Sequence, residues 1–459
     1  MQDIESKTRL FEKKPVFNAL LTLAVPTVAG QVILVIYNMA DTFYIGLCGS
    51  DAMLTAVTVC LPSFMFLSAI ANLFGVGGAS AGARSMGASA PEDAKACGVF
   101  SFFGSLLTTV IYCLLVLLFM NPFIDLLGGT HAAVHAYARQ YMFCTVVIGG
   151  IASSANIFFS HLLRAEGYSL LAGFGISFGG VLNIVLDPLF MFRILQPGNE
   201  VLGAAAATAL SNVIAAFFYI SAILRIHTKL QILNFRPTRH ALVPDIYLPV
   251  LSAGIPACVM TLFENISYAV MDKLISVYGT EMQAGIGVAK KVNMMAHSIV
   301  RGITQGALPL IAYNYASGNH KRMRAALKWA AVLSVGCAAL CMVICLLFDP
   351  QLIGIFIRHE SASLEYGAEF LEILCIGAPF SAAAYTVISF FQATGHGKRS
   401  FFLAILRKGL VDIPLMFLLG SFFSYHGIVS ATPIADILCC ITALFILRDF
   451  LKTHAAEVA

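Results

Sequence analysis

Long apolar runs follow one another along almost the whole sequence, separated by short polar or Gly- and Pro-rich breaks. A helix needs roughly 20 mostly apolar residues to cross a bilayer, because the hydrocarbon core is about 30 Å thick and a helix rises 1.5 Å per residue. No run shows the alternating pattern of a transmembrane barrel strand. We therefore predict twelve membrane-spanning helices, at residues 16–46, 52–80, 96–120, 132–160, 168–192, 202–226, 247–277, 284–312, 326–348, 364–392, 400–423 and 427–447.

The scarcity of charge supports this prediction and excludes other classes of protein. Only 11% of the residues are charged and 59% are hydrophobic, whereas soluble proteins have about 25% charged and roughly 45–50% apolar residues. So few charges cannot cover a water-exposed surface, which excludes a soluble enzyme, a nucleic-acid binder and a disordered scaffold. The sequence also offers no nucleophile elbow, metal-spaced histidine cluster or phosphate loop, so we expect neither a membrane enzyme nor an organic cofactor.

The distribution of Lys and Arg predicts the topology. Cytoplasmic loops are enriched in these residues, and here they gather in alternate connections, whereas the other connections hold only Arg193 and Arg358. Residues 1–14 mix acids and bases ahead of a long apolar run, unlike a cleavable signal. We predict a multi-pass protein of the cell (inner) membrane with both termini in the cytoplasm, where the basic connections hold Lys7, Arg9, Lys13, Lys14, Arg84, Lys95, Arg164, Arg225, Lys229, Arg236, Arg239, Lys321, Arg322, Arg324, Lys328, Lys398, Arg399, Arg448 and Lys452.

An internal repeat covers most of the chain. Residues of the first half recur in the second half in the same order and at a slowly drifting spacing, as in the pairs Tyr37 and Tyr268, Asp41 and Asp272, Gly75 and Gly306, Pro188 and Pro414, and Thr208 and Thr432. Each half has six runs, so both halves enter the membrane in the same direction, as in transporters whose halves rock about a central path. We predict a cytoplasmic N-terminal segment (1–15), an N-lobe (16–226), a cytoplasmic linker (227–246), a C-lobe (247–450) and a cytoplasmic tail (451–459).

Ionisable residues inside apolar runs are candidate functional residues, because charge in the hydrocarbon is unfavourable. Asp41, Asp187 and Thr208 lie on three different runs of the first half at one predicted depth, and Asn183 lies one turn from Asp187 on the same helix face. These oxygens suit a hard cation such as Na⁺. Alternatively, two close carboxylates share a proton, or Asp41 and Asp187 only cap helices or bond neighbouring groups.

The second half holds four acids in its runs, Glu264, Asp272, Asp412 and Asp436. Glu264 lies deepest and is the best functional candidate among them. Basic residues share these runs, and we expect some of them to neutralise the acids as buried pairs: Lys273, Lys290, Lys291, Arg301, Arg407 and Lys408. Asp412 and Asp436 remain candidates for either structural pairs or a second ion site.

Four segments carry a resemblance to a known family. They are "YNMADTFYIGLCGSDAMLTAV" and "NLFGVGGASAGARSMGASAPEDA" in the first half, and "AGIGVAKKVNMMAHSIVRGITQGALPLIAYNYASGNHKRMRAA" and "FFQATGHGK" in the second. With them, the chain resembles the MATE (multidrug and toxic compound extrusion) transporters over about residues 16–450. The resemblance is closest to the bacterial branch that includes the DinF-like and MepA-like exporters.

The resemblance implies an all-α integral membrane fold with twelve helices in two pseudo-symmetric six-helix lobes around a V-shaped cavity. It implies export of small amphipathic or cationic organic compounds in exchange for H⁺ or Na⁺. The family's N-lobe ion site corresponds to Asp41, Asn183, Asp187 and Thr208, so Na⁺ would bind at Asp41 and Asp187. A proline at which the first helix of the family can bend corresponds to Pro26.

In one branch of the family, a seventh-helix Glu matches Glu264, but that branch also uses a tenth-helix Asp. The corresponding stretch here, "SAAAYTVISFFQ", has no acid, which favours coupling through the N-lobe. We expect a monomer in the lipid bilayer that exports small molecules. The alternative is a flippase for lipid-linked precursors or polysaccharides, which Arg301, Arg407 and Lys408 leave open because such proteins have a basic cavity.

Overall fold

The chain is almost entirely helical in the parts that the computed structural model describes, which are residues 9–129, 131–357 and 362–457. The first half contains α2 (Val16–Leu47), α3 (Asp51–Gly87), α4 (Pro91–Leu118), α5 (Met120–Leu126), α6 (Ala132–Met142), α7 (Gly150–Ala165), α8 (Ser169–Leu189) and α9 (Glu200–Ile226). The second half contains α10 (Pro244–Ile275), α11 (Thr280–Ala316), α12 (His320–Gly354), α13 (Ala362–Ile376), α14 (Ala378–Ala393), α15 (Gly397–Ile405) and α16 (Ile413–Glu457). Short helical segments join them: η1 (Arg9–Lys13), η2 (Phe143–Ile148), η3 (Phe190–Ile194), η4 (His227–Lys229), η5 (Arg239–Leu242), η6 (Ser276–Tyr278) and η7 (Leu406–Asp412).

These helices account for the twelve predicted spans. Within the described residues, eight helical stretches are long and apolar enough to cross a membrane, and two bent helix pairs raise the number to ten. One of the eight, Gly397–Thr453, turns back at Phe423 and Ser424, where the backbone leaves the helical region, and so supplies two spans. The twelfth span is α11, which is 37 residues long but less apolar. Many large side chains on the outer faces are exposed, as a lipid-facing surface requires; Leu118 is 74% exposed.

The fourth span of each half is bent, although the sequence predicts one continuous helix at each place. In the first half, α6 and α7 meet at 49° across the π-helical segment η2 and Gly149. In the second half, α13 and α14 meet at 43° at Gly377, two residues before Pro379. A π-helical turn and a proline both interrupt the regular i to i−4 hydrogen bonds, which explains the bends. Their matched positions agree with the internal repeat.

Several helices extend beyond the apolar runs into the segments predicted as connections. Arg84 lies in the last turn of α3 and Arg164 in the last turn of α7, both beyond the ends of the predicted spans 52–80 and 132–160. Helical hydrogen bonding continues after the apolar residues end, because polar residues also form helix at the membrane surface. Lys7 and Arg358, used in the topology prediction, lie outside the described residues.

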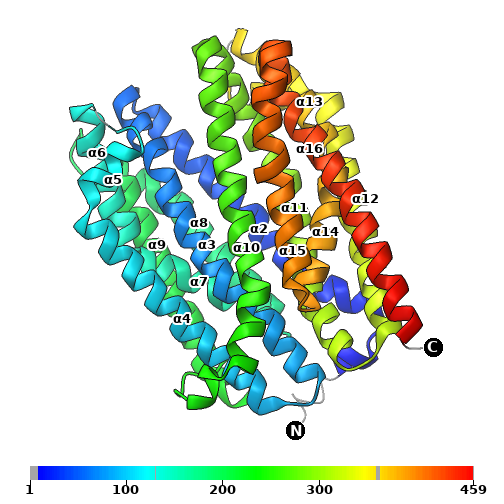
Figure 1. Ribbon diagram of the computed structural model, residues 1–459. Coiled ribbons are helices and arrows are strands. Elements are labelled where there is room, and N and C mark those ends of the chain that lie inside the picture. The colour runs from blue at the N-terminus through cyan, green and yellow to red at the C-terminus, as the bar shows by residue number, and fades with distance from the viewer. Residues whose placement is uncertain (1–8, 130, 358–361, 458–459) are drawn as a thin grey trace.

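The two halves pack against each other through their first two spans. Figure 1 shows the blue-to-green first half beside the green-to-red second half, with α2 and α10 lying centrally. α10 packs along α3, and α11 packs along α2. The contact is closest at glycines: a Cβ added to Gly254 would lie 1.8 Å from the carbonyl oxygen of Leu73, and one added to Gly77 would lie 2.3 Å from that of Val250. The backbones of the two halves therefore touch directly.

Polar contacts tie the halves together at the end of the bundle where both termini lie (Figure 1). Arg84 donates hydrogen bonds to the carbonyl oxygens of Gln392 (3.3 Å) and Ala393 (3.0 Å) at the end of α14. The N-terminal segment also reaches the second half, since the carbonyl oxygen of Phe11 accepts from the Arg322 guanidinium at 2.6 Å. Both chain ends at one end of the bundle are consistent with an even number of spans.

The predicted linker is held against the first half. The buried carboxylate of Glu166 accepts hydrogen bonds from the backbone N–H groups of Gln231, Ile232 and Leu233. The carbonyl oxygen of Ile232 packs against Gly98, where an added Cβ would lie only 1.8 Å away. Residues 231–233 are therefore a fixed part of the first half.

Candidate functional site

Three of the predicted N-lobe residues are hydrogen-bonded to one another. Asn183 and Asp187 lie one turn apart on the buried face of α8, and Thr208 lies on α9. The side-chain amide of Asn183 donates to Oδ1 of Asp187 at 3.0 Å and to Oγ1 of Thr208 at 3.2 Å. The amide of Asn183 therefore joins the fifth and sixth spans.

Asp41, on the buried side of α2, completes this N-half cluster. Its carboxylate is close enough to that of Asp187 for the two charges to repel each other. The hydroxyl of Tyr141 on α6 donates to Oδ2 of Asp41 at 3.4 Å. Asp41 is 8% exposed and Asp187 is fully buried. Two carboxylates are thus enclosed together, a costly arrangement if both stay charged and unpaired.

The N-half cluster has more acceptors than donors. Among the described residues, no donor reaches Oδ1 of Asp41, Oδ1 of Asn183 or Oδ2 of Asp187. Lys291, on α11 of the other half, interacts with Asp41 through its charge, but no hydrogen bond or ion pair joins these two described residues. Buried oxygens without donors suit a species that brings positive charge, which is a proton or a hard cation such as Na⁺.

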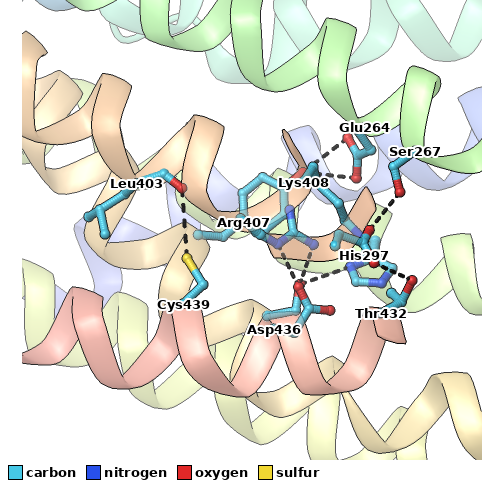
Figure 2. A network of polar contacts seen from close by, with 12 residues as sticks. Glu264, Ser267, His297, Leu403, Arg407, Lys408, Thr432, Asp436 and Cys439 are labelled. Carbon is cyan, nitrogen blue, oxygen red and sulfur yellow. Dashed lines mark hydrogen bonds and ion pairs between the residues drawn. The ribbon is translucent and has the colours of Figure 1, made fainter. Parts of the chain in front are cut away.

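The four predicted acids of the second half are all paired with basic side chains. Lys408 lies 3.0 Å from Oδ2 of Asp412, and Arg407 lies 2.7 Å from Oδ1 of Asp436 (Figure 2). Asp412 also accepts from the hydroxyls of Ser267 at 2.6 Å and Thr432 at 2.9 Å. The expectation that buried basic residues neutralise these acids is confirmed in the structure.

Glu264 and Asp272 are paired in the same way. The guanidinium of Arg301 lies 2.6 Å from Oε2 of Glu264, and the hydroxyl of Tyr385 donates to both oxygens of that carboxylate at 3.1 Å. Asp272 forms an ion pair with Lys290. Each of the four predicted acids therefore has a basic partner, and none of them is left unpaired to form a second ion site.

A small pocket between the halves is lined by residues of both, including the buried Glu264 and the partly exposed Arg301. Residues that line it form hydrogen bonds between the halves: the Asn72 amide of α3 donates to Oγ1 of Thr261 on α10 at 3.0 Å, and Oε1 of Gln305 accepts from Arg164 at 3.0 Å. The lining residues are Asn72, Val76, Ala257, Met260, Thr261, Glu264, Arg301, Thr304, Gln305, Leu308, Tyr385, Ser389 and Gln392.

Sequence reasoning did not identify three residues that bond directly to the predicted acids. Tyr141, Ser267 and Tyr385 each donate a hydroxyl to a buried carboxylate. All three lie in predicted spans, where a hydroxyl needs a partner. Because of this requirement, the sequence could have indicated that these hydroxyls form hydrogen bonds, but it could not have indicated with which acid.

Pro26 lies within α2, which runs through it without a break in helical backbone geometry. Its carbonyl oxygen faces Gly173 of α8, where an added Cβ would lie 2.2 Å away. Pro26 therefore lies at a close contact between α2 and α8, the helix that carries Asn183 and Asp187. Its role as a hinge stays a prediction.

Comparisons with known proteins agree with this architecture. The sequence pattern of the MatE family matches residues 26–189 and again residues 256–418, once in each half. Multidrug export protein MepA of Staphylococcus saprophyticus is 31% identical over 98% of both chains, and MepA of Staphylococcus aureus is 29% identical over the same share. A solved multidrug resistance MATE transporter of the MOP superfamily, in an outward-facing conformation, aligns with a TM-score of 0.86 and 24% identity over 98% of this chain and 99% of that one. A MATE in a straight conformation aligns with a TM-score of 0.87 at 23% identity, over the same shares. The chain belongs to the MATE family of membrane transporters, as its motifs predicted.

Proposed function

We propose that the protein is a secondary active antiporter that exports small amphipathic or cationic organic compounds in exchange for H⁺ or Na⁺. The relatives named as multidrug export proteins support the transported class. The observation that carries the coupling role is the set of three buried oxygens without donors on Asp41, Asn183 and Asp187. A proton or Na⁺ at these oxygens reduces the repulsion between the carboxylates of Asp41 and Asp187. Its binding therefore stabilises the N-lobe, and its release destabilises it.

In this mechanism, the N-half cluster binds the coupling cation, and the pocket between the lobes binds the substrate, in alternation. A cation from outside binds at Asp41 and Asp187, which stabilises the conformation that has released its substrate. Residues that line the pocket form hydrogen bonds between the lobes, and substrate binding there favours separation of those contacts. The two ligands act on one equilibrium between lobe arrangements, as alternating access requires.

The flippase alternative is weaker in this structure. It depends on a basic cavity, for which Arg301, Arg407 and Lys408 were the candidates. Each of the three is paired with a carboxylate, that of Glu264, Asp436 or Asp412 respectively. Together these pairs provide no excess positive charge for a pyrophosphate.

Efflux of a fluorescent organic cation from cells tests the coupling role. We expect Asp41→Asn and Asp187→Asn each to lower the efflux rate at least about tenfold, because either substitution removes a charge that the coupling cation must neutralise. Asp125→Asn, at an exposed acid on α5, is the matched control and should keep the wild-type rate. Wild-type efflux in both cluster variants at equal expression would contradict the proposal. Proteoliposomes with an imposed pH gradient or Na⁺ gradient, one at a time, identify the ion.

A further inference from the structure

The C-half contains a polar cluster built from the same three spans as the N-half cluster. The N-half cluster uses the first, fifth and sixth spans of its half, α2, α8 and α9. The C-half cluster uses Ser267 on α10, Asp412 in η7 and Thr432 on the second arm of α16, which are the first, fifth and sixth spans of that half. Figure 2 shows Ser267 and Thr432 close to Lys408. In both halves the threonine of the sixth span bonds the fifth span: Thr208 to Asn183, and Thr432 to Asp412.

The two clusters differ in how their negative charge is balanced. In the N-half cluster, no basic side chain among the described residues forms an ion pair with Asp41 or Asp187, and oxygens remain without donors. In the C-half cluster, both oxygens of Asp412 have donors, and one of these donors is the ammonium of Lys408. Lys408 is only 2% exposed and lies four residues before Asp412, the spacing that separates Asn183 from Asp187.

A second acid of this half is also paired with a lysine. Asp272 is the repeat partner of Asp41, and it is ion-paired with Lys290 of α11. Both ammonium groups lie near the ring of Tyr268, that of Lys290 at 5.5 Å and that of Lys408 at 5.6 Å from its centroid. Asp412 and Asp272 are therefore both neutralised by a lysine ammonium group, which is a cation that belongs to the protein itself.

We propose that Lys408 is a covalently attached replacement for an exchangeable cation. Its ammonium keeps the C-half cluster in the cation-loaded arrangement throughout the transport cycle, so only the N-half cluster exchanges an ion. This inference rests on the proposed coupling role of the N-half cluster. It follows that a neutral side chain at position 408 leaves the buried carboxylate of Asp412, with the hydroxyls of Ser267 and Thr432, as an oxygen site for a monovalent cation.

The test compares melting temperatures of the purified full chain in choline chloride, sodium chloride and ammonium chloride. We expect Lys408→Asn to melt below the wild type in choline, and to recover most of that loss in Na⁺ or NH₄⁺, because a bound cation stabilises the folded state. The double variant Lys408→Asn/Asp412→Asn keeps no buried charge at the site and should show no such recovery. Binding of radioactive sodium should rise by one ion per chain in Lys408→Asn relative to the wild type.

Two results would overturn the inference. One is a Lys408→Asn protein that stays destabilised, or fails to fold, in all three salts. The other is an equal salt response in the double variant. The proposed function is read separately, from the efflux of Asp187→Asn with Lys408 intact. If Asp187→Asn retains efflux, the coupling proposal fails while the salt response of Lys408→Asn remains measurable.

Discussion

Arg407 and Asp436 form an ion pair that is almost completely removed from solvent inside the second half. The guanidinium also donates to Oγ of Ser381 at 2.7 Å and lies over the ring of Tyr385, 4.4 Å from its centroid. Two buried charges are expensive to desolvate, and only their mutual pairing and these further contacts compensate. Neither residue can lose its partner without a large effect on stability.

We therefore expect Arg407→Leu to destabilise the protein by about 3–5 kcal/mol, because it leaves the carboxylate of Asp436 buried without a counter-charge. Arg407→Leu/Asp436→Leu should recover most of that loss, since it removes both charges. Thermal unfolding in detergent measures both variants. Equal destabilisation of the single and double variants would show that packing, and not charge, dominates at this site.

At the same scale, the sequence predicted which residues matter but not how they pair. The matched depth of Asp41, Asp187 and Thr208, with Asn183 one turn from Asp187, predicted their convergence, and hydrogen bonds join Asn183, Asp187 and Thr208. Depth comes from position along an apolar run, which a sequence contains. Which lysine meets which acid depends on helix rotation, and these helices are apolar on nearly all sides, so periodicity carries no signal.

Among the elements, the contact between α2 and α8 depends on the absence of a side chain at Gly173. Gly173→Ala would place a Cβ 2.2 Å from the carbonyl oxygen of Pro26 and 2.7 Å from its carbonyl carbon, so the two backbones must separate. We expect a loss of roughly 1–3 kcal/mol, as for other overpacked sites, with reduced efflux because α8 carries Asn183 and Asp187.

Gly336→Ala on α12 is the matched control for that substitution. Nothing lies within 4 Å of the Cβ it would add, so it should be neutral or stabilise α12 slightly through its better helix propensity. Unfolding temperatures and efflux rates of the two variants provide the comparison. If Gly173→Ala behaves like Gly336→Ala, the close approach of α2 to α8 is not a constraint on the fold.

The existence and order of the spans could be predicted from length and hydropathy, whereas their irregularities could not. The turn at Phe423 and Ser424 falls in the break between the predicted spans 400–423 and 427–447. The bend at Gly149, in contrast, interrupts a stretch whose composition resembles that of a straight span. Such bends depend on packing between helices and not on local propensity.

For the whole molecule, Arg84 is a tie between the two halves at the end that carries both termini. It reaches the carbonyl oxygens of Gln392 and Ala393 on α14, and that of Pro249 on α10 at 3.4 Å. Bonds to carbonyl oxygens at a helix C-terminus are favoured by the negative end of the helix dipole. We expect Arg84→Ala to favour the arrangement in which this end is open.

Labelling by a membrane-impermeant maleimide measures that shift. In a chain freed of its native cysteines, Ala393→Cys should be labelled several times faster from the side of the termini when Arg84→Ala is added, because Ala393 is fully buried in the closed arrangement. Arg225→Ala, at an exposed arginine in the last turn of α9, is the control and should leave the rate unchanged. An unchanged rate with Arg84→Ala would contradict its role as a tie.

The docking of the linker and of the N-terminal segment also determines the order in which the protein can be completed during synthesis. Glu166 lies 65 residues ahead of its first linker partner, Gln231, so the first half reaches its final packing only after its sixth span has left the ribosome. The carbonyl oxygen of Phe11 accepts a hydrogen bond from Asn314, which lies 303 residues later in the chain. Synthesis of those residues takes roughly 15–60 s at about 5–20 residues per second. Until then, the segment η1 (Arg9–Lys13) lacks its contacts with the second half.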